Sequence, residues 1–222
     1  MIDLINLSKQ YTAGGVTINA LRPTTLSIPE GAFLTVMGPS GSGKSTMLNL
    51  FGMLIQPTTG IYKVNGNAVS SLSDNATSRL RNKTIGMVFQ SFNLLSHLTI
   101  LENVCLPMQY ARVRRGEMRA RAKELLDRLG LAGRYASRPT QLSGGQCQRV
   151  AIARSLANDP PVILADEPTG NLDEKTGLEV MQIFTDLHNA GKTIILVTHN
   201  PSYERYASHR ITIHDGTVTL TT

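Results

Sequence analysis

The sequence predicts an α/β fold in which helices cover both faces of a parallel sheet. Four short segments are β-rich and almost continuously apolar, as expected for strands buried on both faces. They are AFLTVM (32–37), TIGMVF (84–89), PVILA (161–165) and TIILVT (193–198). Polar motifs directly follow three of them, and open α/β sheets bind ligands at the carboxyl ends of their strands. The 222 residues are enough for one substantial domain with an inserted lobe.

Shorter segments with alternating hydrophobicity predict a smaller antiparallel sheet beside the parallel one. They lie near residues 2–7, 24–29 and 60–65. A closing hairpin, RITIHDGTVTL (210–220), turns at Asp215-Gly216, a dipeptide typical of two-residue hairpin turns. We expect this hairpin to belong to the smaller sheet.

The pattern changes to helical periodicity between Gln90 and Pro160. In MRARAKELLDRLG (118–130) one helix face carries four apolar residues, Ala122, Leu125, Leu126 and Leu129. Gly130 is suited to end this helix. We therefore predict an inserted helical subdomain over residues 91–159, while residues 1–90 and 160–222 form the core with its antiparallel β subdomain.

The composition is that of an ordinary globular protein and indicates a cytoplasmic location. Hydrophobic residues make up 41% of the chain and charged residues 17%. The first residues, MIDLINLSKQY, lack the features of a secretion signal, and the apolar runs are too short to cross a bilayer. Cys105 and Cys147 belong to no CxxC pair and have no nearby His, which argues against a disulfide framework and a zinc site.

The net charge of +6 is concentrated in one stretch. Residues 112–138 contain nine Lys or Arg against Glu117, Glu124 and Asp127, while the remainder is neutral. A solvated helix face, proximity to anionic lipid and nucleic-acid binding all fit such a stretch. Because neither interleaved aromatic residues nor a nucleic-acid module accompanies it, we expect no nucleic-acid partner.

The segment GPSGSGKST (38–46) satisfies the phosphate-binding pattern GxxxxGK[ST]. It stands between a predicted strand and the helical run KSTMLNLFGML, which is the context that the pattern requires. Lys44 is suited to reach the β and γ phosphate oxygens, and the Ser45 hydroxyl to bind Mg²⁺. The predicted nucleotide-binding residues are Gly38, Pro39, Ser40, Gly41, Ser42, Gly43, Lys44, Ser45 and Thr46.

Polar side chains at the other strand ends are candidates for catalysis. In VILADE (162–167), Asp166 is placed to hold the magnesium shell and Glu167 to activate the attacking water. Gln90 ends GMVFQ and is a candidate to contact metal or water, while His199, in ILVTHN, is a candidate to bond the γ-phosphate.

A second glycine-rich loop, LSGGQ (142–146), precedes a predicted helix. One nucleotide does not need two such loops about a hundred residues apart. Either one loop has no role in binding or each serves a different nucleotide.

Taken together, the phosphate-binding loop, Gln90, LSGGQ, VILADE, NLD (171–173) and His199 resemble the nucleotide-binding subunits of ABC transporters over essentially the whole chain. The resemblance implies the P-loop NTPase (RecA-like) fold and hydrolysis of ATP with Mg²⁺. It also implies that Tyr11 stacks on adenine. The implied active form is a head-to-tail homodimer, in which Ser143, Gly144, Gly145 and Gln146 of one subunit complete the site on the other and Asp173 crosses the interface.

Within that family, QSFNLLSHLT, SRPTQLSGGQ and ADEPTGNLDEKTG most resemble the MacB/LolD group. The resemblance implies a separate membrane permease that contacts residues 91–104, and a location on the cytoplasmic face of the inner membrane. The apolar residues expected at that contact are Phe92, Leu94, Leu95 and Leu98; the alternative is that they pack inside the helical lobe. Two other roles stay open: an FtsE-like ATPase that transmits force without transport, and a nucleic-acid-linked ABC ATPase.

Overall fold

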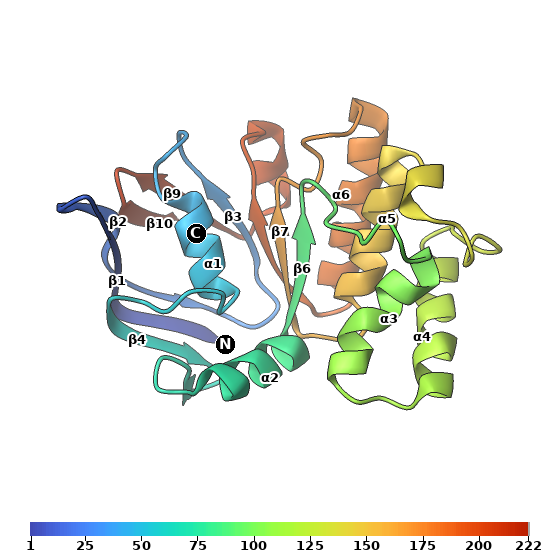
Figure 1. Ribbon diagram of the computed structural model, residues 1–222. Helices are drawn as coiled ribbons and strands as arrows, with labels where there is room; N and C mark the ends of the chain where they lie inside the picture. Colours follow the sequence, from blue (N-terminus) through green and yellow to red (C-terminus); the bar gives the residue numbers. More distant parts are fainter. Residues whose placement is uncertain (222) are drawn as a thin grey trace.

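The computed structural model describes residues 1–221 and contains a six-stranded and a four-stranded sheet (Figure 1). The strand order is β10-β9-β3-β8-β7-β6 in the larger sheet and β2-β1-β4-β5 in the smaller. The strands are β1 (Ile2–Ala13), β2 (Val16–Ile28), β3 (Phe33–Met37), β4 (Thr59–Val64), β5 (Asn67–Ala68), β6 (Ile85–Phe89), β7 (Val162–Asp166), β8 (Thr193–Val197), β9 (His209–His214) and β10 (Thr217–Thr221). The helices are α1 (Lys44–Phe51), α2 (Asp74–Thr84), α3 (Ile100–Tyr110), α4 (Arg115–Arg128), α5 (Gly144–Ser155) and α6 (Glu174–Asn189), with short 3-10 helices at Pro139–Gln141 and Pro201–Tyr206.

All four predicted buried strands are confirmed, and they pair in parallel as neighbours in the order β3-β8-β7-β6 within the larger sheet. Their register aligns Phe89 of β6 with Asp166 of β7, and Asp166 with Val197 of β8. The residues that follow these strands therefore lie side by side at the carboxyl end of the sheet, toward which the arrow of β6 points in Figure 1.

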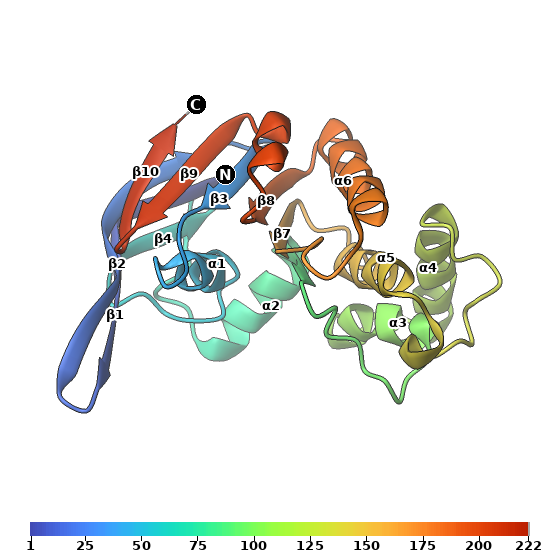
Figure 2. The same cartoon turned by 90° about the horizontal axis from the view of Figure 1, so that it is seen from above.

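The two faces of the larger sheet are covered by different elements. On β7, Val162 and Leu164 pack in one core with α1 and the antiparallel sheet. The alternate residues Ile163 and Ala165 pack in a second core with α3, α4, α5 and α6. Helices α1 and α5 consequently lie on opposite sides of the sheet, as Figure 2 shows.

The predicted turn at Asp215-Gly216 is present, but the prediction that its hairpin joins the smaller sheet is wrong. Strand β9 pairs in parallel with β3, so the hairpin extends the larger sheet. The sequence misled because Ile211 and Ile213 are fully buried while their neighbours in β9 are exposed or half-buried. Such alternation indicates that one face of the strand is covered, but it does not show which of the two sheets the strand joins.

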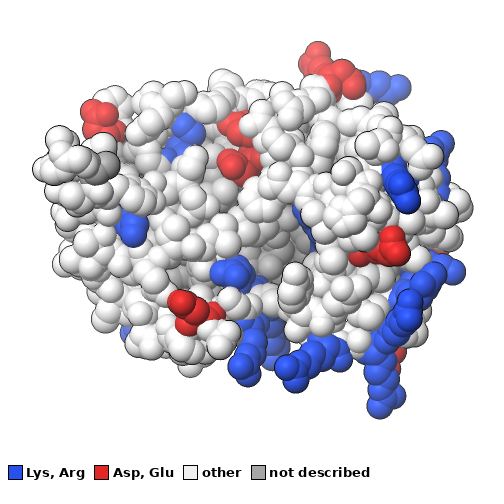
Figure 3. Space-filling view, in the orientation of Figure 1, with Lys and Arg blue, Asp and Glu red and all other residues white. Residues whose placement is uncertain are grey.

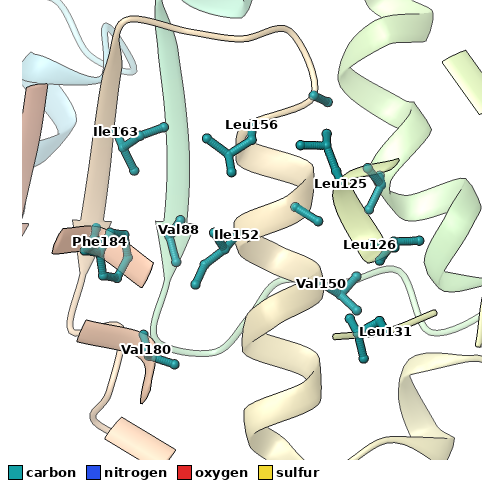
Figure 4. Close-up of a cluster of buried hydrophobic side chains, with 14 of the residues drawn as sticks. Val88, Leu125, Leu126, Leu131, Val150, Ile152, Leu156, Ile163, Val180 and Phe184 are labelled. Atoms are coloured by element: carbon teal, nitrogen blue, oxygen red, sulfur yellow. The ribbon is translucent and has the colours of Figure 1, made fainter. Parts of the chain in front are cut away.

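The helical periodicity predicted for residues 118–130 is confirmed by α4. Ala122, Leu125 and Leu126 are buried in the second core, and Gly130 follows the helix with a φ of 74°. Figure 4 shows how this core continues from α4 through α5 to the sheet, where Ile152 of α5 lies near Val88 of β6. Helices α2 and α6 were not predicted.

The buried side chain of Asn103 anchors the segment before α3 through hydrogen bonds to its backbone. Its fully buried side chain accepts from Leu95 N at 2.8 Å and donates to Leu95 O at 3.1 Å and Thr99 O at 2.9 Å. We expect Asn103→Ala to lower the free energy of unfolding by about 1–3 kcal/mol, because buried backbone groups of Leu95 and Thr99 lose a partner. Urea unfolding would measure the loss. The exposed Asn75 is the control, since Asn75→Ala should change stability by less than about 0.5 kcal/mol.

Candidate nucleotide-binding site

The loop between β3 and α1 has a backbone shape that requires glycine at two positions. Gly38 has a φ of 149° and Gly43 a φ of 113°, both in the region that side chains rarely adopt. A Cβ on Gly38 would collide with the backbone oxygen of Ile213, and one on Gly43 with that of Ala20. The loop is thus enclosed by neighbouring backbone, and its N–H groups are held for an anion at the start of α1.

A cleft of about 480 Å³ lies against this loop. Its lining comprises Ile18, Asn19, Ala20 and Arg22 of β2, residues 41–46, and Asp215 and Gly216. Gly216 N donates to Ser42 O at 3.0 Å, and Arg22 N donates to Gly216 O at 2.8 Å. The hairpin turn and β2 therefore form walls of the cleft. Sequence analysis missed these walls because no motif marks residues so distant along the chain.

Lys44 is only 7% exposed, and its ammonium group donates to Gly38 O and Pro39 O, each at 2.8 Å. Burial lowers the pKa of Lys44, while the nearby carboxylates of Glu167 and Asp166 raise it. In the described chain no carboxylate lies within ion-pair distance of Lys44. A buried cation held only by two carbonyl oxygens is suited to an anionic ligand.

Glu167 follows β7 in a backbone conformation that is unusual for a residue with a side chain, with a φ of 44°. Its N–H donates to Val197 O at 2.9 Å, which fixes the residue against β8. The Oε1 atom is buried and has no hydrogen-bond partner among residues 1–221; His199 Nε2 approaches it only to 3.6 Å. Burial raises the pKa of Glu167, and His199 lowers it. An unpartnered carboxylate oxygen with a raised pKa is suited to accept a proton.

Asp166 ends β7 and is also partly buried. Burial raises its pKa, while Lys44 and His199 lower it. The exposed Ser45 lines the cleft in the first turn of α1. Carboxylate and hydroxyl oxygens suit Mg²⁺, which keeps several waters and takes few protein ligands. No group of three or more His, Cys, Asp or Glu able to hold a metal occurs in the described part of the chain.

Gln90 follows β6 and is tied to the segment after Glu167. Its Nε2 donates to Asn171 Oδ1 at 3.4 Å, and Asn171 Nδ2 donates to Gln90 O at 3.1 Å. Together with the register of β6, β7 and β8, these bonds place Gln90, Glu167 and His199 at the carboxyl end of the sheet, as predicted.

The second glycine-rich loop begins α5. Ser143 accepts from Gln146 N at 3.3 Å and Gln146 accepts from Ser143 N at 3.1 Å, which forms a capping box. Asp173 caps α6 by accepting from Thr176 N at 3.0 Å, and this bond lowers the pKa of Asp173. A Cβ on Gly145 would collide with the methyl group of Thr176. The two helix N-termini are therefore packed side by side, with Ser143 and Asp173 exposed.

The second glycine-rich loop takes no part in the cleft against the first loop. The cleft at the first loop has no lining residue from 142–146. The loops also begin helices on opposite faces of the sheet, α1 and α5. A nucleotide held by the first loop thus leaves the second loop of the same chain open toward solvent.

Tyr11 stands beside the cleft but does not line it. It pairs with Ile18 across β1 and β2, and Ile18 is a lining residue. The Tyr11 side chain is 42% exposed, with the Lys9 ammonium 5.1 Å from its ring centroid. Stacking of Tyr11 on adenine stays a prediction.

The apolar patch predicted after Gln90 is smaller than expected. Leu95 is 42% exposed, whereas Phe92, Leu94 and Leu98 are half-buried. Leu94 packs against the second core, so the alternative of packing inside the helical region holds for this residue. Arg154 of α5 donates to the backbone oxygens of Phe92 and Asn93 and holds the segment in place.

The profile of the family described as "ABC transporter" matches residues 21–170. The chain belongs to the ABC transporter family. It is 50% identical over 218 residues to an uncharacterized ABC transporter ATP-binding protein of Thermotoga maritima, covering 98% of this chain and 93% of that protein. A macrolide export ATP-binding/permease protein MacB of Chlorobaculum tepidum is 48% identical over 98% of this chain, which spans only 33% of that protein.

Solved structures of ABC cassettes show the same fold. The ATP-binding cassette MJ0796, in a dimeric post-hydrolysis state bound to ADP and Pi, matches with a TM-score of 0.92 and 46% identity. The match covers 100% of this chain and 98% of that one. The protein is thus an ABC ATPase cassette with the P-loop NTPase fold. In its described part, no helix is both long and apolar enough to cross a membrane.

Proposed function

We propose that the chain binds and hydrolyses ATP and thereby drives a separate MacB/LolD-type permease through ATP-dependent dimerisation. The observation that carries this proposal is the placement of the two glycine-rich loops at the starts of helices that lie on opposite faces of one sheet. The first loop can hold a nucleotide by itself, so both loops engage a nucleotide only if the second loop meets a site on another subunit. The similarity to MacB ATP-binding/permease proteins supports the type of permease.

In this proposal, residues 38–46 hold the phosphates, and Lys44 exchanges its two carbonyl partners for phosphate oxygens. Ser45, Gln90 and Asp166 would hold the Mg²⁺ ion. Bound Mg²⁺ would neutralise charge on the phosphates during the reaction. Tyr11 supports the adenine beside Ile18, which lines the cleft.

Glu167 acts as the general base. Its buried Oε1 accepts no hydrogen bond, so this oxygen is available to take a proton from the attacking water. The Nε2 atom of His199 lies 3.6 Å from Glu167 Oε1, and the His199 side chain is 54% exposed. This side chain forms a hydrogen bond with the γ-phosphate. The left-handed backbone conformation of Glu167 and the hydrogen bond from its N–H to Val197 O in β8 fix the position of this carboxylate.

The proposed dimer is head to tail. Ser143, Gly144, Gly145 and Gln146 of one subunit approach the γ-phosphate on the other, and the N-terminus of α5 offers it positive charge. Asp173 lies at the same interface because α6 begins beside α5. Residues 91–159 would then move as a helical subdomain relative to residues 1–90 and 160–222.

We expect Ser143→Arg to eliminate ATP hydrolysis while leaving ATP binding by the monomer nearly intact. The arginine would block only the site on the opposite subunit, and the first cleft contains no residue of the second loop. Calorimetry would measure binding and phosphate release would measure turnover. Ser143→Asn, which preserves helix capping, is the control for damage to α5. Loss of ATP binding by Ser143→Arg alone would show that both loops serve one nucleotide.

The permease part of the proposal requires peripheral attachment to the cytoplasmic face of the inner membrane, with residues 91–104 at the contact. Purification from gently solubilised membranes tests it directly. A permease with a large external domain is the expected companion. A ribosome or DNA in its place would contradict the proposed partner.

A further inference from the structure

The positive charge that the sequence concentrates around α4 is divided between two flanks of that helix. On one flank Glu117 pairs with Arg114, and Glu124 pairs with Arg121 and Arg128. Both acidic side chains are therefore engaged by arginines three or four residues away, as in many exposed helices. Ordinary pairing within the helix accounts for the charge on this flank.

Three cations occupy the other flank of α4. Arg115, Arg119 and Lys123 follow one another at intervals of four residues and so lie along one line of the helix surface. All three are exposed, and no ion pair within residues 1–221 includes them. Like charges at this spacing weaken a helix, so their arrangement does not serve the stability of α4.

A fourth exposed cation, Arg138, joins this line from the segment after α4. Hydrogen bonds from Thr99 lower the pKa of Glu102 most, and the charges of Arg119 and Arg138 lower it further. The two arginines therefore lie near one carboxylate, which already accepts from Thr99 N at 2.8 Å. We call four residues together the basic stripe: Arg115, Arg119, Lys123 and Arg138.

The basic stripe has no exposed aromatic residue beside it. Tyr135 is the one aromatic residue of the sequence between 112 and 138. It is half-buried, its ring lies 5.3 Å from the Lys123 ammonium, and its hydroxyl donates to Asp127. The stripe thus lacks the platform on which nucleic-acid bases stack and the aromatic anchor typical of protein interfaces. Long cations on a convex helix flank instead suit an extended array of phosphate groups.

The basic stripe adjoins the proposed permease contact at residues 91–104. Ile100 N donates to Ser137 O at 2.8 Å, and Leu101 N donates to Tyr135 O at 3.3 Å. The segment that carries Arg138 is therefore fixed to the start of α3. Figure 3 shows Lys and Arg side chains extending into solvent at the lower right, where Figure 1 places α4.

We propose that the basic stripe binds the anionic phospholipid headgroups of the membrane beside the permease. The inference rests on the proposed function, which brings this side of the chain to the membrane. Each Lys or Arg close to an anionic bilayer strengthens attachment by roughly fivefold. Four cations would together favour the membrane-bound state by several hundredfold at low salt, and less as salt screens them.

Sedimentation of the purified chain with lipid vesicles tests the proposal without a permease. The chain should bind vesicles of phosphatidylglycerol and phosphatidylcholine, release them as salt is raised, and ignore vesicles of phosphatidylcholine alone. No binding to the anionic vesicles, or equal binding to both kinds, would overturn the proposal. Soluble glycerol phosphate at the same phosphate concentration should not displace the vesicles; displacement would show a site for single phosphates and refute a membrane surface.

Charge removal locates the binding surface. Arg119→Gln combined with Lys123→Gln should weaken binding to the anionic vesicles by roughly 25-fold, the product of two fivefold factors. Lys63→Gln combined with Arg205→Gln removes the same charge from β4 and from the 3-10 helix Pro201–Tyr206, and should bind nearly as well as the unaltered protein. Equal losses in the two variants would show attraction by net charge alone and refute the stripe.

Purification with a permease separates this inference from the proposed function. The Arg119→Gln, Lys123→Gln variant should keep its permease and its ATP turnover in detergent, because neither residue belongs to the nucleotide site or to residues 91–104. Loss of the permease from this variant would assign the stripe to a protein contact and overturn the lipid proposal. If the unaltered protein bound anionic vesicles through the stripe but associated with no permease, the proposed function would fail and the lipid contact would stand.

Discussion

Glu167→Gln is expected to lower ATP turnover by roughly 10²- to 10⁴-fold, the usual contribution of general-base catalysis. The change is nearly isosteric and leaves Lys44, Asp166 and both glycine-rich loops intact, so ATP binding should persist. The ATP-bound dimer should then accumulate, since hydrolysis is its route of exit and ligand shared by two subunits stabilises their association. Chromatography with light scattering should report about twice 24.1 kDa with Mg-ATP and a monomer with ADP.

Glu30→Gln is the matched control for this change. Glu30 is an exposed residue in the turn before β3 and should retain full turnover without a stable dimer. Wild-type turnover in Glu167→Gln would exclude Glu167 as the base. A monomer at saturating ATP, with binding intact, would show that dimerisation needs the permease.

Lys44→Ala should abolish tight ATP binding. The substitution removes the buried cation of the loop, whose two present partners are backbone oxygens. Loss of one partner of a buried charge pair costs about 2 to 5 kcal/mol, which corresponds to a dissociation constant roughly 30- to 5,000-fold weaker. Isothermal calorimetry would measure the change.

Lys192→Ala separates this effect from a general loss of positive charge. Lys192 pairs with Asp159 at 2.7 Å and precedes β8, at the opposite end of the sheet from the cleft. Its replacement should leave the affinity for ATP unchanged. If a folded Lys44→Ala protein kept its affinity, the assignment of residues 38–46 to phosphate binding would be wrong.

Strands β3, β6, β7 and β8 of the larger sheet and the phosphate-binding loop could be predicted because their signals are local. Each buried strand is an apolar run, and the loop is a contiguous motif between a strand and a helix. Helix α2 gave no such signal, since DNATSRLRNKT buries only Thr77 and Thr84 and has no apolar stripe. Helix α6, with Val180, Met181 and Phe184 buried, does carry a stripe that the prediction overlooked.

Tertiary relations account for the rest of what the sequence could not provide. Nothing in residues 18–22 indicates that they face the phosphate-binding loop, because the contact depends on how β2 meets the hairpin turn. The contact of Gly145 with Thr176 likewise depends on the packing of α5 against α6. The alternating hydrophobicity of β9 indicated a strand with one buried face, but it did not decide whether β9 joins the larger or the smaller sheet.

The partnership between β3 and β9 gives the chain a definite order of maturation during synthesis. Residues 38–46 leave the ribosome well before strand β9, which pairs with β3, and before Gly216, whose N–H donates to Ser42 O. A domain generally folds as a unit during synthesis. A nascent chain that stops before Gly216 therefore contains residues 38–46 but lacks a finished nucleotide cleft, and competence to bind nucleotide arises only after β9 and Gly216 have been made.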